Sequence, residues 1–241
     1  MGYKFDFGPV WDAMPSLLWG CLGTLGLALA GMSLATVIGI GGVMLRDSRF
    51  PPLRWLVMAF VELIRNTPFL VQIYFIFFAL PLLGVELGNL LHWLGLVDKP
   101  GNILRLTPTT TAIIALGVNG GAYAIEIIRG GVQSINKGQV EAGLALGLHR
   151  AQVFRLIVLK PALRAIYPSL TSQFTLLTLT TSIASAIAAY ELTSVAQIVE
   201  SNSFRSFEVY FTVTLLYLFM SWLMTLLFNF IWRRNFNYPV K

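Results

Sequence analysis

The stretch that decides the fold class is residues 16–45, SLLWGCLGTLGLALAGMSLATVIGIGGVML, which contains no Asp, Glu, Lys or Arg. Roughly 20 apolar residues in a helix cross the hydrocarbon core of a bilayer, which is about 30 Å thick. The whole chain shares this character, because 56% of its 241 residues are hydrophobic and 12% are charged. Soluble domains are about 45–50% apolar and about 25% charged. We therefore expect a membrane protein, which argues against a cytosolic enzyme, a disordered scaffold or a secreted module.

Four more charge-free windows are long enough to cross a bilayer. They are residues 66–85, 106–125, 165–190 and 209–232. These windows are too long and too uniformly apolar for barrel strands, whereas a helix satisfies its own backbone in lipid. A sixth window, residues 87–97, is too short to span and predicts an interfacial helix. The expectation is an all-α, polytopic membrane protein with five transmembrane helices in a single domain covering residues 1–241.

The basic residues orient these spans. Five spans place the two termini on opposite sides of the membrane. With the N-terminus outside, only Lys4, Lys99, Arg105 and Arg205 of the 17 Lys and Arg residues lie outside. Cytoplasmic loops carry an excess of Lys and Arg, so we expect a periplasmic N-terminus and a cytoplasmic C-terminus. The net charge of +6 then reports topology, and no nucleic-acid partner is expected.

Polar residues within the spans suggest a path for a solute. The candidates for lining it are Gln72, Asn119, Tyr123, Gln173, Thr178, Thr181 and Ser182. The alternative is that these groups bond to their own helix or hold neighbouring helices together. Small residues four positions apart, at Gly31, Ala35 and Gly39 and again at Gly117 and Gly121, predict close helix packing. That packing could lie within this chain or at a subunit interface.

Two Glu-x-x-Arg pairs stand where spans meet the cytoplasmic side. Glu62 with Arg65 and Glu126 with Arg129 each share a helix face at i,i+3. We interpret them as ion pairs that anchor helix ends at the headgroups. Pro68 follows the first pair and lacks an N–H, so it should bend or break the helix there.

The segment between the third and fourth spans, residues 129–164, is too long for a simple connection and contains many apolar side chains. We expect a short helix over residues 137–146, a break at Gly147 and an amphipathic helix over residues 150–159. Pro161 should then turn the chain into the fourth span. Such an element predicts a docking site for a partner, and the alternative is a helix lying on the membrane surface.

No catalytic, metal or cofactor site is expected. Two histidines and the lone Cys21 cannot build a Cys/His zinc site. The sequence also has no Gly-x-x-x-x-Gly-Lys-Ser/Thr loop for nucleotide phosphates.

The loop resembles the EAA loop of bacterial ABC importer permeases through Glu141-Ala142-Gly143, Gly147 and Ile157-Val158-Leu159. The segments ELIRNTP at 62–68, RGGVQS at 129–134 and YELT at 190–193 are similar to the polar amino-acid uptake subfamily. The residues that the resemblance assigns to coupling are Glu141, Ala142, Gly143, Gly147, Leu148 and Arg150.

This resemblance implies a non-catalytic permease subunit in the bacterial inner membrane. Two permeases would form the translocation path, and two ATPase subunits, which bind the ATP and magnesium, would each grip one EAA loop. A periplasmic binding protein would deliver the amino acid.

The chain departs from the family pattern at Gly143 in place of alanine and at Lys160 in place of proline. Leu179-Thr180 also stand where many relatives carry Lys-Asp. The last difference predicts that a second, non-identical permease supplies the missing charges. The alternative function is an ion-coupled secondary transporter working alone. Such a protein uses intramembrane carboxylates, and none lies in the five windows.

Overall fold

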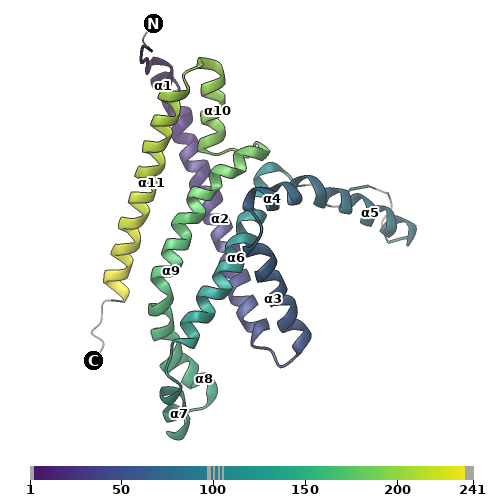
Figure 1. Ribbon diagram of the computed structural model, residues 1–241. Coiled ribbons are helices and arrows are strands. Elements are labelled where there is room, and N and C mark those ends of the chain that lie inside the picture. The colour runs from purple at the N-terminus through teal and green to yellow at the C-terminus, as the bar shows by residue number, and fades with distance from the viewer. Residues whose placement is uncertain (1–2, 97–98, 100, 103, 105, 237–241) are drawn as a thin grey trace.

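The computed structural model describes residues 3–96, 99, 101–102, 104 and 106–236, and within those residues it is helical, with no strand (Figure 1). Four long elements, α2, α6, α9 and α11, form the body. The regular α-helices are α1 (Gly8–Asp12), α2 (Met14–Arg46), α3 (Pro51–Arg65), α4 (Phe69–Tyr74), α5 (Leu80–Trp93), α6 (Pro108–Gln133), α7 (Lys137–Ala145), α8 (Arg150–Val153), α9 (Leu159–Thr180), α10 (Leu192–Ser203) and α11 (Ser206–Asn235). Three wider or tighter helical segments complete the chain: η1 (Phe75–Ala79), η2 (Phe154–Val158) and η3 (Thr181–Ile187).

The body is held together mainly by α2 against α6, and small residues make the contact. A Cβ built at Gly39 would stand 2.7 Å from the Ala124 Cβ, and one at Gly31 would stand 2.8 Å from the Leu116 Cβ. From the other side, a Cβ at Gly121 would lie 2.6 Å from Ile38. The predicted small-residue faces are therefore confirmed as packing within this chain.

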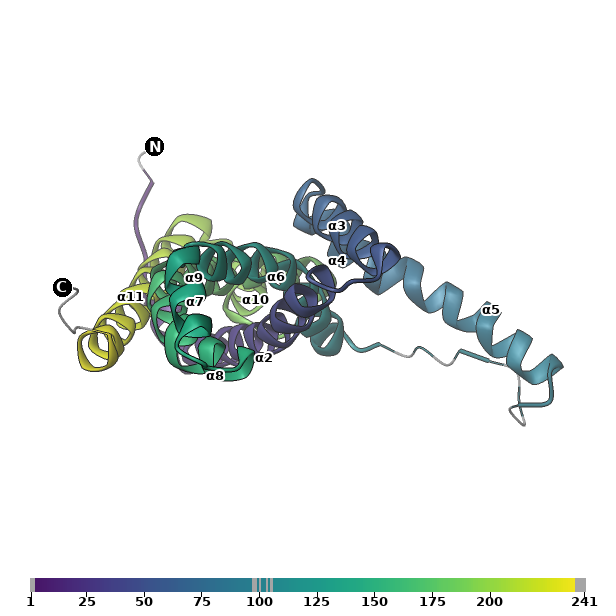
Figure 2. The same cartoon turned by 90° about the horizontal axis from the view of Figure 1, so that it is seen from below.

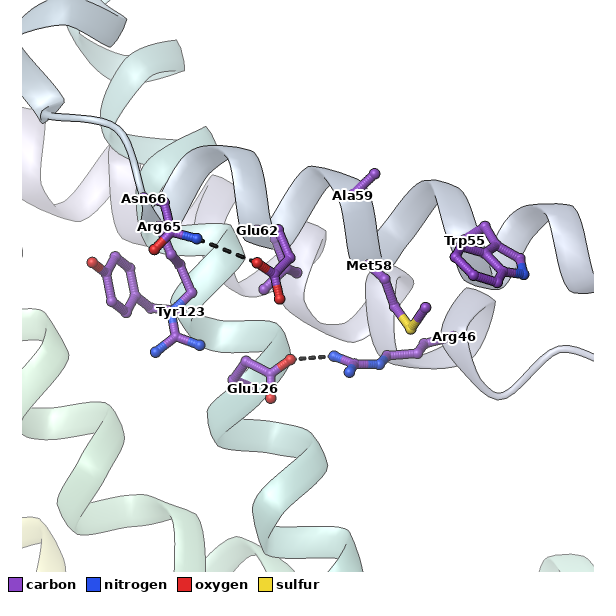
Figure 3. A pocket seen from close by; sticks show the side chains of 10 residues that line it. Arg46, Trp55, Met58, Ala59, Glu62, Arg65, Asn66, Tyr123 and Glu126 are labelled. Atoms are coloured by element: carbon purple, nitrogen blue, oxygen red, sulfur yellow. Dashed lines mark hydrogen bonds and ion pairs between the residues drawn. The ribbon is translucent and has the colours of Figure 1, made fainter.

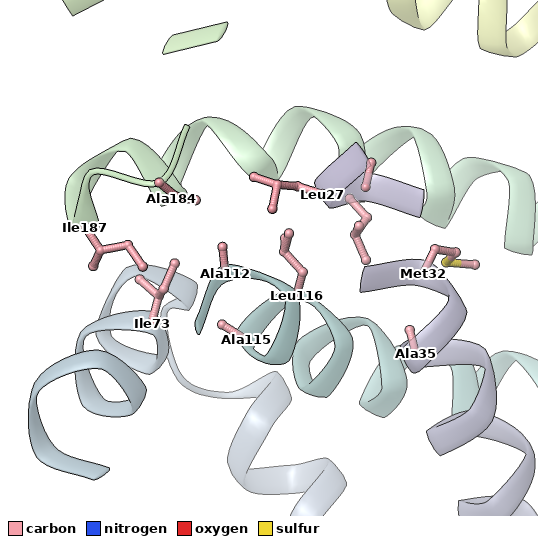
Figure 4. Packing of buried hydrophobic residues seen from close by; sticks show 12 residues of the cluster. Leu27, Met32, Ala35, Ile73, Ala112, Ala115, Leu116, Ala184 and Ile187 are labelled. Atoms are coloured by element: carbon pink, nitrogen blue, oxygen red, sulfur yellow. The ribbon is translucent and has the colours of Figure 1, made fainter. Parts of the chain in front are cut away.

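The central apolar cluster lies where α2, α4, α6, α9 and η3 meet (Figure 4). Met32 from α2, Ile73 from α4 and Leu116 from α6 are fully buried there. Ala112, Ala115 and Ala184 keep the backbones close. The cluster therefore joins the two halves of the chain.

Within the described residues, four helices are long and apolar enough to cross a membrane: α2, Phe69–Trp93, α6 and α11. A fifth candidate is the pair Arg150–Ile187 and Leu192–Ser203, which is bent by 50°. The predicted windows at 16–45 and 209–232 match α2 and α11 closely. The third window is too short, because α6 continues to Gln133.

Two predicted breaks are wrong. The segment 87–97 is not a separate interfacial helix, because α5 runs from Leu80 through Glu86 to Trp93 (Val97 itself lies outside the described residues). The exposed carboxylate of Glu86 ends the charge-free window at residue 85, but it does not interrupt the helix. Nor does Pro161 turn the chain, since the helix continues from Arg150 to Ile187. The wide turn η2 directly precedes Pro161, and such local widening lets helices accommodate proline. The loop that was predicted at 129–164 is therefore only residues 134–149.

The break predicted at Pro68 is confirmed, because α3 ends at Arg65 and α4 begins at Phe69. Beyond it, η1 and α5 form an arm that points away from the body (Figures 1 and 2). Phe78, Leu82 and Leu87 on the arm are exposed. This arm therefore has few contacts within its own chain.

A buried carboxylate holds the bend between η3 and α10. The Glu191 side chain accepts the N–H groups of Thr193 at 2.8 Å and Ser194 at 2.6 Å, and the Tyr217 hydroxyl donates to it at 2.8 Å. Thr24 on α2 accepts the Leu192 N–H at 3.1 Å. Glu191 is fully buried and ties the bend to α2 and α11.

The N-terminal segment is fastened at the same end of the body. Tyr3 donates its hydroxyl proton to the buried Glu208 carboxylate, which also accepts the Asp6 N–H at 2.9 Å. This hydrogen bond to Glu208 raises the pKa of the Tyr3 phenol. Arg205 lies 3.8 Å from Asp6 and 3.9 Å from Glu208.

The α2–α6 contact predicts that Gly39→Ala destabilises the protein by about 1–3 kcal/mol, because the added methyl overlaps Ala124 and forces the helices apart. Gly41→Ala on the same helix is the control, since nothing lies within 4 Å of a Cβ there. It should be neutral or stabilise by up to about 1 kcal/mol. The free energy of unfolding in detergent micelles measures both, and equal values for the two variants would contradict the packing.

Candidate functional site

The helix–glycine–helix element of α7, Gly147 and α8 projects from one end of the body (Figure 1). The Asn136 side chain caps α7 by accepting the Gly138 N–H at 2.8 Å. At the other end, the N–H of Gly147 donates to Leu144 at 3.0 Å and that of Leu148 donates to Gly143 at 3.2 Å. This pattern is a Schellman motif, which requires a left-handed residue, and Gly147 has φ +83°. The predicted helix and its glycine break are confirmed.

The element is rigid because α7 packs closely on η2. A Cβ at Gly143 would stand 2.4 Å from the Ile157 Cδ1 atom, so glycine at this position brings the two segments together. Glu141, Ala142 and Arg150 are exposed, Leu148 is half-buried, and Leu146 at the tip is 83% exposed. Leu144 on α7 and Phe154 and Leu156 on the adjoining η2 are exposed as well, and several exposed apolar side chains on one projecting element are typical of an interaction surface.

Gln72, a candidate pathway residue, closes the helix break instead. Pro68 has no N–H to give to the carbonyl of Ile64, four residues earlier. The Gln72 side-chain nitrogen donates to that carbonyl at 2.7 Å and to the Thr67 carbonyl at 3.0 Å. Its oxygen accepts from the Asn119 amide at 3.0 Å. Gln72 and Asn119 are therefore brought together, but they join α4 to α6 and satisfy backbone groups.

The hydroxyls of the fourth span bond back to their own helix. Thr178 donates to the Phe174 carbonyl at 2.9 Å, Thr181 to Thr178 at 2.7 Å and Ser182 to Leu179 at 2.8 Å. Thr178 and Thr181 are also buried within this chain. Of the candidates on this helix, Gln173 and Ser182 remain half-exposed.

A polar cleft of about 740 Å³ lies between the end of α2, α3 and α6 (Figure 3). On its wall Glu126 forms the predicted ion pair with Arg129, at 4.0 Å, and it also pairs with Arg46, which the sequence did not suggest as a partner. The predicted pairing of Glu62 with Arg65 is not formed. Glu62 accepts from Asn66 at 3.3 Å, and the Arg65 guanidinium lies over the Tyr123 ring, 5.3 Å from its centroid, as a cation–π contact.

The comparisons with known proteins agree on one family. The model of the binding-protein-dependent transport system inner membrane component matches residues 31–235. The chain belongs to this family. It is 36% identical to the glutamine transport system permease protein GlnP of Escherichia coli (strain K12), covering 96% of each chain. It is 34% identical to the octopine transport system permease protein OccM of Rhizobium radiobacter, covering 93% of this chain and 88% of that one.

A solved structure supports the same conclusion. A crystal structure of an amino acid ABC transporter with histidines contains a chain that is 28% identical, with a TM-score of 0.80, covering 96% of this chain and 100% of that chain. The protein described here is therefore an inner-membrane permease subunit of an ABC transport system. It is a transport component and not an enzyme.

Sequence reasoning missed Glu191 and Glu208 because both lie just outside the charge-free windows that were searched. The signal was present for Glu191, whose neighbours Thr193 and Ser194 follow it at the distance of a helix cap. Arg46 was also missed as the partner of Glu126, since it lies 80 residues away in the chain.

The bonds of Gln72 predict that Gln72→Leu lowers the free energy of unfolding by about 1–3 kcal/mol, because the Ile64 carbonyl and the Asn119 amide lose their partner in a buried site. The same change at the exposed Gln133 is the control and should have little effect. Unfolding in detergent micelles compares the two. An unchanged stability in Gln72→Leu would contradict the closure of the break by this side chain.

Proposed function

We propose that this permease serves ATP-driven uptake of an amino acid and that ATPase subunits drive it through α7, Gly147 and α8. The observation that carries the proposal is the projecting, capped element with Leu146 bare at its tip. The sequence has no phosphate-binding loop of its own. Energy from ATP must therefore arrive through a protein contact, and this element is the largest projection on its side of the body.

The proposed orientation has five spans, counting the bent pair as one. The N-terminus is periplasmic and the C-terminus is cytoplasmic. Support comes from the basic residues, which gather at the end of the body that carries α7 and α8. Arg233 and Arg234 end α11 there, and Arg46 ends α2. On this orientation the coupling element is in the cytoplasm, within reach of an ATPase.

We propose a second, non-identical permease as the membrane partner. The arm of η1 and α5 exposes apolar side chains such as Phe78 and Leu82 and has few contacts with its own chain. The chain also has Leu179-Thr180 where a charged pair would hold a zwitterion. A partner that covers the arm and supplies charge would complete the path, to which Tyr123, Gln173 and Ser182 remain candidates from this chain. A binding protein on the periplasmic side would supply the substrate.

The substrate class follows from the relatives, whose names specify glutamine and octopine, an amino-acid derivative. An amino acid carries both charges of a zwitterion, which suits a path shared between two different chains. The coupling site is argued from the structure and the substrate class from the relatives, so each can be tested without the other.

The coupling role predicts that Gly147→Asp abolishes substrate uptake and substrate-stimulated ATPase activity in proteoliposomes of the whole importer. Asp tolerates the left-handed conformation better than most residues, so the variant keeps the bend and places a charge at the contact. Glu141→Lys should have the same effect by reversing a charge on exposed α7.

Gly130→Asp is the matched control, because Gly130 is exposed at the end of α6 with open space around it. It should leave uptake within about two-fold of the unaltered importer, since it lies outside the coupling element. Membrane insertion should be the same in all three variants. Normal uptake in both Gly147→Asp and Glu141→Lys would remove the coupling proposal.

A further inference from the structure

A small basic hollow lies at the turn between α2 and α3, beside the end of α6. Its volume is about 250 Å³. The residues that line it are Arg46, Asp47, Ser48, Arg54, Met58 and Arg129. Three guanidinium groups and one carboxylate therefore line one small space.

Part of this charge has no protein partner. Arg46 is paired with Glu126, on the wall of the neighbouring cleft (Figure 3). Arg54 makes no ion pair with a carboxylate anywhere in the part of the chain that the structure describes. The Nε atom of Arg129 is buried and lacks a hydrogen-bond acceptor. Glu126 is shared between Arg46 and Arg129, so the three arginines around the hollow keep an excess of positive charge.

The surroundings of the hollow are those of a membrane surface. Met44 and Leu45 at the end of α2, and Phe50, Trp55 and Leu56 at the start of α3, are exposed, Trp55 by 69%. Tryptophan concentrates at the level of the headgroups. Figure 1 shows α7 and α8 projecting beyond the α2–α3 turn, so the hollow lies nearer the membrane than the coupling element does. A ligand with an anionic head and apolar tails would therefore match both the hollow and its surroundings.

We propose that this hollow binds an anionic phospholipid of the cytoplasmic leaflet, with its phosphate diester accepting hydrogen bonds from Arg54 and Arg129. Guanidinium groups match phosphate oxygens in pairs, and basic pockets between spans on the cytoplasmic side suit such headgroups. The acyl chains lie along Met44, Leu45 and Leu56. This inference depends on the orientation given under Proposed function and does not depend on ATP coupling or on the substrate.

The test is native mass spectrometry of the full-length permease in detergent, titrated with phosphatidylglycerol or with phosphatidylcholine at fixed ionic strength. Arg54→Gln should weaken phosphatidylglycerol binding about five-fold, because one basic residue near the headgroup contributes about 1 kcal/mol. Arg49→Gln is the matched control. Arg49 is exposed in the same turn, and it does not line the hollow, so its variant should bind as the unaltered chain does. Arg54→Lys should retain part of the affinity.

Four results would overturn the proposal. An equal loss in Arg49→Gln would mean diffuse attraction to a basic surface. Equal binding of phosphatidylcholine would remove the need for an anionic head. Displacement of the lipid by millimolar inorganic phosphate would assign the hollow to a soluble anion. Displacement by added ATPase subunits would assign it to a protein contact. Native mass spectrometry measures lipid binding without any transport step. A failure of the lipid proposal is therefore distinct from a failure of the coupling proposal.

Discussion

In the hydrocarbon of a bilayer there is no water for a backbone amide or carbonyl, so every break in a spanning helix needs a partner from the protein. The described part of the chain has one such break inside a spanning segment, at the bend before α10, and another directly before the span that begins at Phe69. Each is closed by one buried side chain. At Pro68 the side-chain amide of Gln72 donates a hydrogen bond to the Ile64 carbonyl, which the proline leaves without a donor. At the bend before α10 the carboxylate of Glu191 accepts hydrogen bonds from two backbone N–H groups and from the Tyr217 hydroxyl. The arm and the bent span both depend on these two caps.

Much of the architecture could be predicted from the sequence, because lipid imposes a simple rule on composition. The windows at 16–45 and 209–232 match α2 and α11, and the left-handed Gly147 follows from its place after a short helix. The errors come from treating charge and proline as absolute breaks. Glu86 lies on an exposed helix face, and Pro161 follows a widened turn, so both helices continue.

The site was less predictable, because it depends on contacts between distant segments. Residue type alone suggested that Gln72, Thr178 and Thr181 line a path, yet their polar atoms serve the backbone. Glu126 forms its predicted ion pair with Arg129 three residues away, at 4.0 Å, and a second one with Arg46 on another helix, which no local pattern indicates. By contrast, the α7–Gly147–α8 element was predictable, since its helices, cap and bend are all local in sequence.

The arm formed by η1 and α5 also affects the stability of the subunit before it assembles. A single copy of the chain presents a long apolar segment that its own fold barely stabilises. Segments with few stabilising contacts open locally and are cleaved by proteases more readily, so a chain that covers the arm would also protect this subunit from degradation. If the second permease proposed above covers the arm, matched synthesis of the two chains is a requirement of the fold as much as of the transport cycle.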